Sequence, residues 1–348
     1  MNEKLKRLRE KIASHNCDAL LIEHSIDLLY LTGMHLSAGK LIISPHDSCL
    51  IVDGRYYETC CLQNVYTVRL LSETALQEWL KSNAIQTLGF DTHHTTYHRF
   101  VLLQDMAKNL NADLIPLDAP IEKMRMLKGQ KEIEYLRKAA RLGFEGYEYV
   151  VSLLKEGISE AELAFELEFF WKKKGASGLA FDPIIAFGAN SSMPHYRAGP
   201  TKLKNNTSVL IDIGVILDNY NSDMTRVVFF GEVASVMQSI YQIVDEAKSK
   251  ALELCRPGTL IGDLDKAARE WITSKGYGEN FTHSLGHGVG LDIHEAPTIR
   301  ATGAYTNVPL QAGMVITIEP GIYLPKIGGV RLEDTILITE IGYENLTE

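Results

Sequence analysis

The chain has 348 residues, and 44 Asp and Glu against 35 Lys and Arg give a formal net charge of −9. This length exceeds one ordinary hydrophobic core and predicts two domains, and 45% hydrophobic with 23% charged residues is a globular composition. The acidic balance, without any basic run, argues against nucleic acid as the main partner, because binding to phosphates depends on Lys and Arg.

The first 117 residues alternate between helix and strand patterns, which predicts a small α/β domain. Residues 1–16 are expected to form an amphipathic helix, with Leu5, Leu8 and Ile12 at spacings of three and four. This charged N-terminus has no apolar segment typical of a signal peptide. Further helices are expected at 26–31, 55–62, 73–82 and 98–109, and strands at 18–22, 40–44, 48–52, 67–71 and 87–90.

A domain boundary is expected at Asp118-Ala119-Pro120, giving domains 1–120 and 121–348. A long helix over 122–151 and a second helix after Gly157 open the second domain. Ser159 and Glu162 have the spacing of a capping box at the start of the second helix. Strands are then expected at 183–187, 208–216 and 222–230, helices at 235–255 and 262–275, and mostly strands from 306 to 341. This grouping predicts an α+β domain with a curved, largely antiparallel sheet.

Two aspartates lie on opposite arms of an expected hairpin in 208–230, which turns at Leu217-Asp218-Asn219. Asp212 stands in an apolar strand, and Asp223 follows on the returning arm. A bare carboxylate in an apolar strand costs several kcal/mol unless it is paired or binds a metal. A salt bridge to Arg226 is a competing interpretation for Asp223, whereas Asp212 has no equally simple one.

Two glutamates follow in the last third of the chain. Glu319 ends a strand pattern in VITIEPGIY and precedes Pro320-Gly321, which stops the strand. Arg331 and Glu333 share one face of the next strand by its period of two. An Arg331–Glu333 ion pair at a sheet edge is the competing interpretation here.

The stretch FTHSLGHGVGLDIHEAP, residues 281–297, is rich in histidine and glycine. It contains His283, His287 and His294, with Gly286, Gly288 and Gly290 around the middle histidine. Imidazole is the commonest side-chain metal ligand, and glycine lets backbone and substrate approach it closely. Turn glycines beside ordinary polar histidines are the competing interpretation.

Two Asp, two Glu and one His at strand ends suit Mn, Co, Fe or Zn rather than a thiolate site. Four carboxylates carry four negative charges, which two divalent cations balance. Two such ions about 3.5–4 Å apart can share one hydroxide, and coordination lowers the pKa of the bound water.

The motifs resemble the pita-bread metallopeptidases: methionine aminopeptidase, aminopeptidase P, prolidase and the metal-free creatinase. The Xaa-Pro peptidases, prolidase and aminopeptidase P, are the most similar of these. CDALLIEHSIDLLYLTG and LIVDGRYYE resemble the creatinase/prolidase N-terminal domain, and EKMRMLKGQKEIEYLRKAA resembles the helix that enters the catalytic half. The resemblance covers almost the whole chain.

This resemblance implies a ligand set for two divalent cations. Asp212 would bind the first metal, and Asp223 and Glu333 would bridge both. His287 and Glu319 would complete the second metal, and Glu319 would also take the proton of the attacking water.

The resemblance also implies roles around the metals. His195 matches a histidine beside the scissile carbonyl, and His294 matches one that binds the substrate carbonyl. Arg331 matches a position that supports the ligands or the substrate carboxylate. His283 is expected to orient a neighbour or to pack, and Tyr220 to line the pocket or pack in the hairpin.

The expected activity is hydrolysis of Xaa-Pro bonds in dipeptides or at peptide N-termini, by a homodimer that uses Mn or, alternatively, Co or Zn. Five cysteines without a C-x-x-C pair indicate reduced thiols and a cytoplasmic protein, and no apolar run is long enough to cross a membrane. The alternatives are a catalytically inactive pita-bread binding module, another aminopeptidase of the fold such as methionine aminopeptidase, and metal-free creatinase-like C–N hydrolysis.

Overall fold

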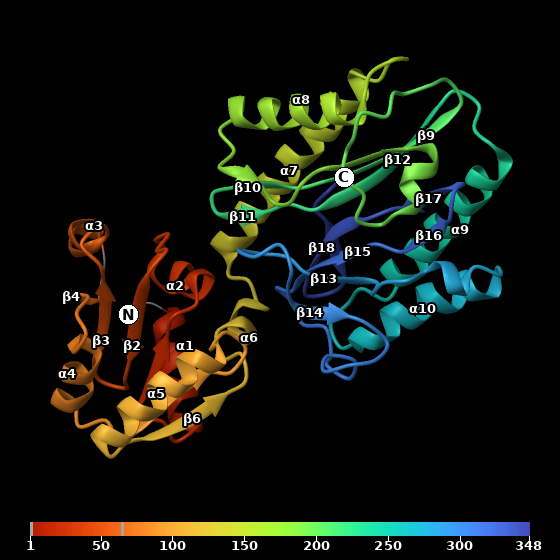
Figure 1. Cartoon of the computed structure of the whole chain (residues 1–348). Coiled ribbons are helices and arrows are strands. Elements are labelled where there is room, and N and C mark those ends of the chain that lie inside the picture. The colour runs from red at the N-terminus through yellow and green to blue at the C-terminus, as the bar shows by residue number, and fades with distance from the viewer. Residues whose placement is uncertain (1–2, 64–65) are drawn as a thin grey trace. The chain divides into compact units, whose positions relative to one another are not determined.

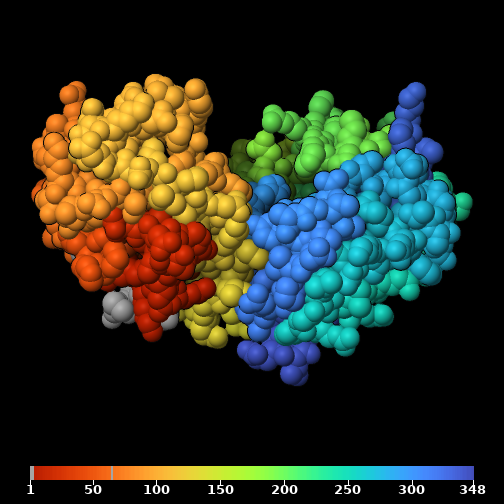
Figure 2. All heavy atoms as spheres, turned by 90° about the horizontal axis from the view of Figure 1, so that it is seen from below, coloured from red at the N-terminus to blue at the C-terminus, as the bar shows by residue number. Residues whose placement is uncertain are grey.

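The first third of the chain builds a six-stranded sheet in the order β4-β3-β2-β1-β5-β6, shown in the computed structural model of Figure 1. The structure describes residues 3–63 and 66–348, so residues 1 and 2 of the first predicted helix lie outside it. The chain divides into two compact units, Met1–Arg125 and Met126–Glu348. The first unit runs from red to yellow in Figures 1 and 2.

The N-terminal unit is the α/β domain that the alternating pattern predicts. Its strands are β1 (Ala19–Ile22), β2 (Gly39–Ile43), β3 (Ser48–Val52), β4 (Thr67–Leu70), β5 (Thr87–Asp91) and β6 (Asp113–Leu117). Its helices are α1 (Glu3–Ser14), α2 (Ser25–Thr32), α3 (Tyr57–Gln63), α4 (Ala75–Ser82), α5 (Tyr97–Leu110) and α6 (Glu122–Arg125). Strand β6 has no counterpart among the predicted strands.

Strand β1 is central in this sheet, because it pairs antiparallel with β2 on one side and parallel with β5 on the other. Strand β5 in turn pairs parallel with β6. Trp79 of α4 and Leu103 of α5 are fully buried against the sheet. Burial of such large apolar side chains supplies the main stabilising contribution to a domain of this kind.

The long helix predicted over 122–151 is interrupted. Helix α6 ends at Arg125, and α7 (Gln130–Ser152) begins after Gly129, whose backbone is extended. The Lys128 N–H donates to the Gly313 carbonyl at 2.9 Å, and the Gly129 N–H donates to Glu132 Oε2 at 2.9 Å. These two hydrogen bonds replace the backbone bonds of a continuous helix, so one helix ends at Arg125 and the next begins at Gln130.

Helix α8 (Glu160–Lys173) begins with the predicted capping box. The Glu162 N–H donates to Ser159 Oγ at 3.2 Å, and the Ser159 N–H donates to Glu162 Oε2 at 2.8 Å. Helices α9 (Ser235–Leu252) and α10 (Ile261–Ser274) confirm the two later predicted helices. Their apolar faces belong to one core cluster with Ile316 and Ile336 of the C-terminal sheet.

The strands of the C-terminal unit pair antiparallel throughout the described part of this unit. Three- and two-stranded sheets contain β7 (Gly178–Leu179), β8 (Ile184–Phe187), β9 (Thr207–Ile213), β10 (Val215–Leu217), β11 (Tyr220–Asn221), β12 (Met224–Phe230), β16 (Gly321–Leu324) and β17 (Gly328–Arg331). A five-stranded sheet contains β13 (Gly286–Gly288), β14 (Glu295–Ile299), β15 (Val315–Ile318), β18 (Asp334–Ile338) and β19 (Tyr343–Asn345). Short 3₁₀ helices lie at Gly188–Ser192 and Gly278–Asn280.

The strand predicted over 208–216 is two strands in different sheets, divided at Gly214. A Cβ at Gly214 would lie 2.4 Å from the Ser222 carbonyl oxygen, so only glycine allows this crossing of the two arms. The predicted turn is confirmed: Asp218 and Asn219 have φ of 51° and 72°, and Leu217 pairs with Tyr220. Two central residues with positive φ are typical of the tight turns that join hairpin strands.

Among the helices that the structure describes, none combines the length and the apolar composition that crossing a membrane requires. The five cysteines carry free thiols.

Candidate metal centre

The ends of several strands place acidic and imidazole side chains around one cavity of about 660 Å³. Asp212 lies at the end of β9, and Asp223 lies between β11 and β12. His287 is the central residue of β13, Glu319 directly follows β15, and Glu333 precedes β18. All five line the cavity, together with His195, His283, His294 and Arg331.

His287 lies among the carboxylates. Its Nε2 is 3.6 Å from Asp223 Oδ2 and 3.4 Å from Glu319 Oε1. Donor atoms of Asp223, His287 and Glu333 all lie within 4.8 Å of one another. His287 Nδ1 is 3.1 Å from the Gly288 carbonyl, which can only accept, so Nδ1 carries the proton and Nε2 faces the acids with a free lone pair.

Close approach of strands β13, β14 and β15 explains the glycines around His287. A Cβ at Gly286 would lie 2.1 Å from the Thr317 carbonyl oxygen, and one at Gly288 would lie 2.3 Å from the Ala296 carbonyl oxygen. The histidine strand therefore packs against both neighbours without side chains between the backbones.

The sequence of this chain is similar to those of known metallopeptidases. Metallopeptidase family M24 matches residues 134–340, and the creatinase/prolidase N-terminal domain matches residues 4–127. A Pyrococcus horikoshii Xaa-Pro dipeptidase is 37% identical over all of this chain and 97% of the relative. The chain belongs to metallopeptidase family M24.

Solved structures of M24 relatives confirm the predicted fold class, an α/β N-terminal domain followed by an α+β pita-bread domain. An Xaa-Pro dipeptidase from Bacillus anthracis aligns with a TM-score of 0.93 at 36% identity, over 99% of this chain and 97% of that one. An X-Pro aminopeptidase from Thermotoga maritima aligns with a TM-score of 0.89 at 32% identity, over 99% and 98% of the two chains.

The donor set of this M24 chain fits the divalent cations that the family implies. Burial raises the pKa of Glu333 to about 8, and the neighbouring Asp212 contributes to the rise. Burial and the Glu333 charge likewise raise the pKa of Asp223 and of Glu319 well above the ordinary range. Asp212 Oδ1 is buried without a hydrogen-bond partner. Cations bound in this cavity would offset the repulsion between the carboxylates and would coordinate the carboxylate oxygen that has no hydrogen-bond partner.

Arg331 holds two of the carboxylates in place, one directly and one through Thr225. Its guanidinium donates to Asp212 Oδ2, to Tyr323 Oη at 2.7 Å and to Thr225 Oγ1 at 3.2 Å. Thr225 Oγ1 in turn donates to Glu333 Oε2 at 2.7 Å. The predicted alternative of an Arg331–Glu333 ion pair is therefore wrong, because the guanidinium is engaged by Asp212.

The other competing ion pair is also wrong. Arg226 donates to Asp334 Oδ1 at 2.8 Å and to the Thr347 carbonyl at 2.9 Å. No ion pair joins Arg226 to Asp223 among residues 3–63 and 66–348. The Asp223 carboxylate is therefore not engaged by Arg226 and lines the cavity.

The three remaining histidines of the cavity have different surroundings. The His294 ring packs edge-on against the His287 ring at a centroid distance of 4.4 Å, and His195 lines the cavity without a ring contact in the described part of the chain. His283 Nδ1 is 2.8 Å from the Ser284 carbonyl and its Nε2 is 2.9 Å from Tyr323 Oη. Burial lowers the pKa of His283 to about 4, so the ring is neutral and accepts from the tyrosine hydroxyl.

Some members of the network were not singled out from the sequence. Tyr323 joins His283 to Arg331, and Thr225 joins Arg331 to Glu333. The register of the hairpin, which pairs Thr225 with Asp212, is the signal that could have identified Thr225. Tyr220 does not line the cavity; it donates to Glu132 at 2.9 Å and stacks on Tyr135.

A buried ion pair anchors the strand that follows His294. Lys128 Nζ donates to Glu295 Oε1 at 2.7 Å, and both side chains are at most 2% exposed. Lys128→Met should lower the free energy of unfolding by about 3–5 kcal/mol, because it leaves a carboxylate buried without its cation. Urea unfolding measures this change.

Lys266→Met is the matched control, because Lys266 Nζ lies 3.1 Å from Asp263 Oδ1 in a pair that is about half exposed. It should cost less than about 1 kcal/mol. Equal losses in the two variants would contradict an anchoring role for Lys128.

Proposed function

We propose that this M24 metallopeptidase hydrolyses Xaa-Pro peptide bonds with two divalent cations. The observation that carries the proposal is the convergence of four carboxylates and one neutral imidazole on a single cavity. The relatives named Xaa-Pro dipeptidase and X-Pro aminopeptidase, which align along nearly the whole chain, support the choice of substrate. An intact donor set argues against a catalytically inactive binding module.

We assign the ligands as follows. Asp212, Asp223, His287, Glu319 and Glu333 would hold the two ions, because all five side chains line the same cavity. Bound there, the cations would polarise the peptide carbonyl and lower the pKa of a coordinated water.

Glu319 is the proton carrier in this proposal. Thr317 Oγ1 donates to Glu319 Oε1 at 3.2 Å and also accepts from the His287 N–H at 3.0 Å, which fixes the carboxylate beside the imidazole. In the metal-free chain, burial and the Glu333 charge raise its pKa. The proton then passes to the proline nitrogen, which leaves as a secondary amine.

His195 and His294 line the same cavity and would bind the substrate carbonyl, because imidazole N–H groups can donate to a developing oxyanion. Arg331 is proposed as a positioning residue: its donors are engaged by Asp212, Tyr323 and Thr225, so it acts through the ligands. His283 orients Tyr323 in the same network.

We propose Mn²⁺ as the cation, with Co²⁺ or Zn²⁺ as substitutes, because four oxygen donors and one nitrogen favour a hard or borderline ion. We further propose a cytoplasmic homodimer, in which residues 1–120 form the N-terminal domain and 121–348 the catalytic domain. Five free thiols agree with a reducing compartment.

The direct test of function is a peptide panel assayed with Mn²⁺. Ala-Pro should be cleaved at least tenfold faster than Ala-Ala, because the site accepts a prolyl nitrogen that has no N–H to satisfy. Pro-Ala, which has the same composition but no peptide bond to the proline nitrogen, is the control and should resist cleavage. Equal rates for Ala-Pro and Ala-Ala would contradict the proposal.

Ala-Pro-Ala separates the two forms of the activity. A cavity closed behind the proline favours the dipeptide, and an open one favours the tripeptide. We expect Ala-Pro to be the better substrate, because two of the similar proteins are named Xaa-Pro dipeptidase. Faster cleavage of Ala-Pro-Ala would instead assign an aminopeptidase.

A further inference from the structure

A second cavity, of about 430 Å³, lies in the N-terminal unit at the carboxyl ends of β1 and β5. These two strands are adjacent and parallel, but the chain leaves them in opposite directions, from β1 to its neighbour β2 and from β5 to its other neighbour β6. In open α/β sheets the crevice at such a switch point is where ligands bind. This unit contains none of the proposed catalytic residues, so the cavity needs an explanation of its own.

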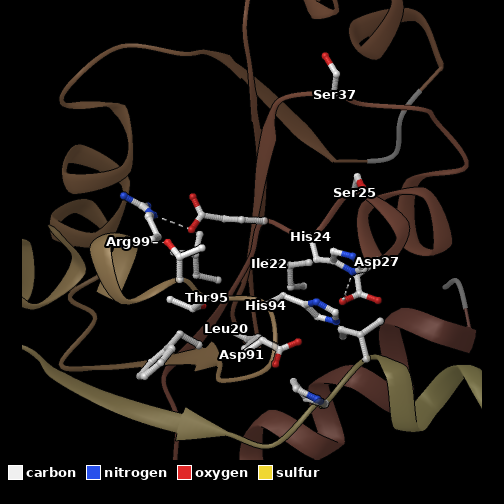
Figure 3. Close-up of a pocket in the computed structure, with 16 residues that line it drawn as sticks. Leu20, Ile22, His24, Ser25, Asp27, Ser37, Asp91, His94, Thr95 and Arg99 are labelled. Atoms are coloured by element: carbon white, nitrogen blue, oxygen red, sulfur yellow. Dashed lines mark hydrogen bonds and ion pairs between the residues drawn. The ribbon is translucent and has the colours of Figure 1, made fainter. Parts of the chain in front are cut away.

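Two imidazoles and a carboxylate meet in this cavity, as Figure 3 shows. His24 follows β1, Asp27 lies in the first turn of α2, and His94 lies in the loop between β5 and α5. Donor atoms of the three residues lie within 4.8 Å of one another. His24 Nδ1 is 3.4 Å from Asp27 Oδ2, and the rings of His24 and His94 stack at a centroid distance of 3.6 Å.

Two polar atoms of this cavity are buried and have no hydrogen-bond partner. His24 occupies the N-cap position of α2, but its side chain makes no capping bond, and its Nδ1 is buried without a hydrogen-bond partner. Asp91, at the end of β5, lines the same cavity and has a buried Oδ2 without a partner. Buried polar atoms of this kind are uncommon unless a ligand or water satisfies them.

One carboxylate oxygen faces the imidazoles of the cavity. Arg125 Nη1 donates to Asp27 Oδ1 at 3.0 Å, which leaves Oδ2 facing His24. Glu23, which also lines the cavity, is already paired with Arg99 at 2.8 Å.

We propose that His24, Asp27 and His94 form a divalent transition-metal site in the N-terminal domain. Two imidazole nitrogens and one carboxylate oxygen are a common ligand set for Zn²⁺, with a fourth position open to water. The stacked rings must turn to share one ion, and His94 is exposed on a loop that allows this. The ion would tie the β1–α2 junction to the β5–α5 loop.

Zn²⁺ content of the full-length chain tests the proposal. Metal-free protein is dialysed against Zn²⁺, and bound zinc per chain is measured by atomic emission. Wild-type protein should retain one more equivalent than either His94→Ala or His24→Phe. His24→Phe keeps an aromatic ring against His94 but removes the donor nitrogen, so a loss of zinc reports ligation and not packing.

His98→Ala is the matched control, because His98 is an exposed histidine of the neighbouring helix α5 and should bind as much zinc as wild type. His287→Ala removes a proposed catalytic ligand, and adding His94→Ala to it should remove a further equivalent. This separates the outcome from that of the catalytic centre. Equal zinc in wild type and both ring variants, or an equal loss in His98→Ala, would overturn the proposal.

Discussion

Glu319→Gln should lower the kcat of Ala-Pro hydrolysis by about 10²–10⁴-fold, the usual contribution of a general acid–base group. Glutamine keeps the length of the side chain and one oxygen that can still face a cation, but it cannot accept and release a proton. Steady-state kinetics at saturating Mn²⁺ measures the change. KM should move much less than kcat, because the proton is transferred only in the chemical step.

Metal content must be measured on the same samples, because Glu319 is proposed to hold an ion as well as a proton. Loss of activity with both ions retained assigns the proton transfer to Glu319. Glu340→Gln, at an exposed position, is the control and should leave kcat unchanged. Normal turnover by Glu319→Gln would remove this residue from the chemistry.

Metal-free protein should lose stability as the pH rises from 6.5 to 8. Glu333 has its pKa raised from 4.5 to about 8 in the folded chain, so the folded state binds more protons than the unfolded state between these values. Stability therefore falls with rising pH across this window, with a slope of up to about 1.4 kcal/mol per pH unit for each such group. The raised pKa values of Asp223 and Glu319 act in the same direction.

Two histidines of the cavity explain why the pH range of this prediction begins at 6.5. Burial lowers the pKa of His283 and of His287 from 6.5 to about 4, so these residues add stability mainly as the pH rises from 4 to 6.5, and the remaining gain above pH 6.5 is smaller than the loss from the three carboxylates. Above that pH the carboxylates determine the sign.

Urea unfolding at pH 6.5 and 8, with and without Mn²⁺, checks the prediction. We expect a loss on the order of 2 kcal/mol in metal-free protein and little change in the loaded protein, since cations that bind only the folded state replace the protons. Metal-free protein that is equally stable at both pH values would show that the acids are not crowded.

Local sequence signals singled out five residues that the structure places around one cavity, and their roles as ligands stay a prediction. A tight turn at Asp218-Asn219 brings the two arms of the hairpin together, and Pro320 marks the strand end beside Glu319. An acid in an apolar strand, such as Asp212, has few stable environments, so its presence is informative by itself. These features depend on residues close in sequence, which is why they could be read without a structure.

Tertiary contacts decided what the sequence did not show. The helix break at Lys128-Gly129 depends on a bond to Gly313, and the strand break at Gly214 depends on Ser222 and Phe181. Likewise the partner of Arg331 is Asp212, on a distant strand, and not its near neighbour. Pattern within one strand cannot identify partners that the fold brings from elsewhere.

Anomalous diffraction from crystals grown with Mn²⁺ is the most direct measurement of the paired-cation centre. We expect two peaks about 3.5–4 Å apart, each within coordination distance of the side chains of Asp212, Asp223, His287, Glu319 and Glu333. Crystals of active enzyme that show no anomalous peak among these five side chains would contradict the account.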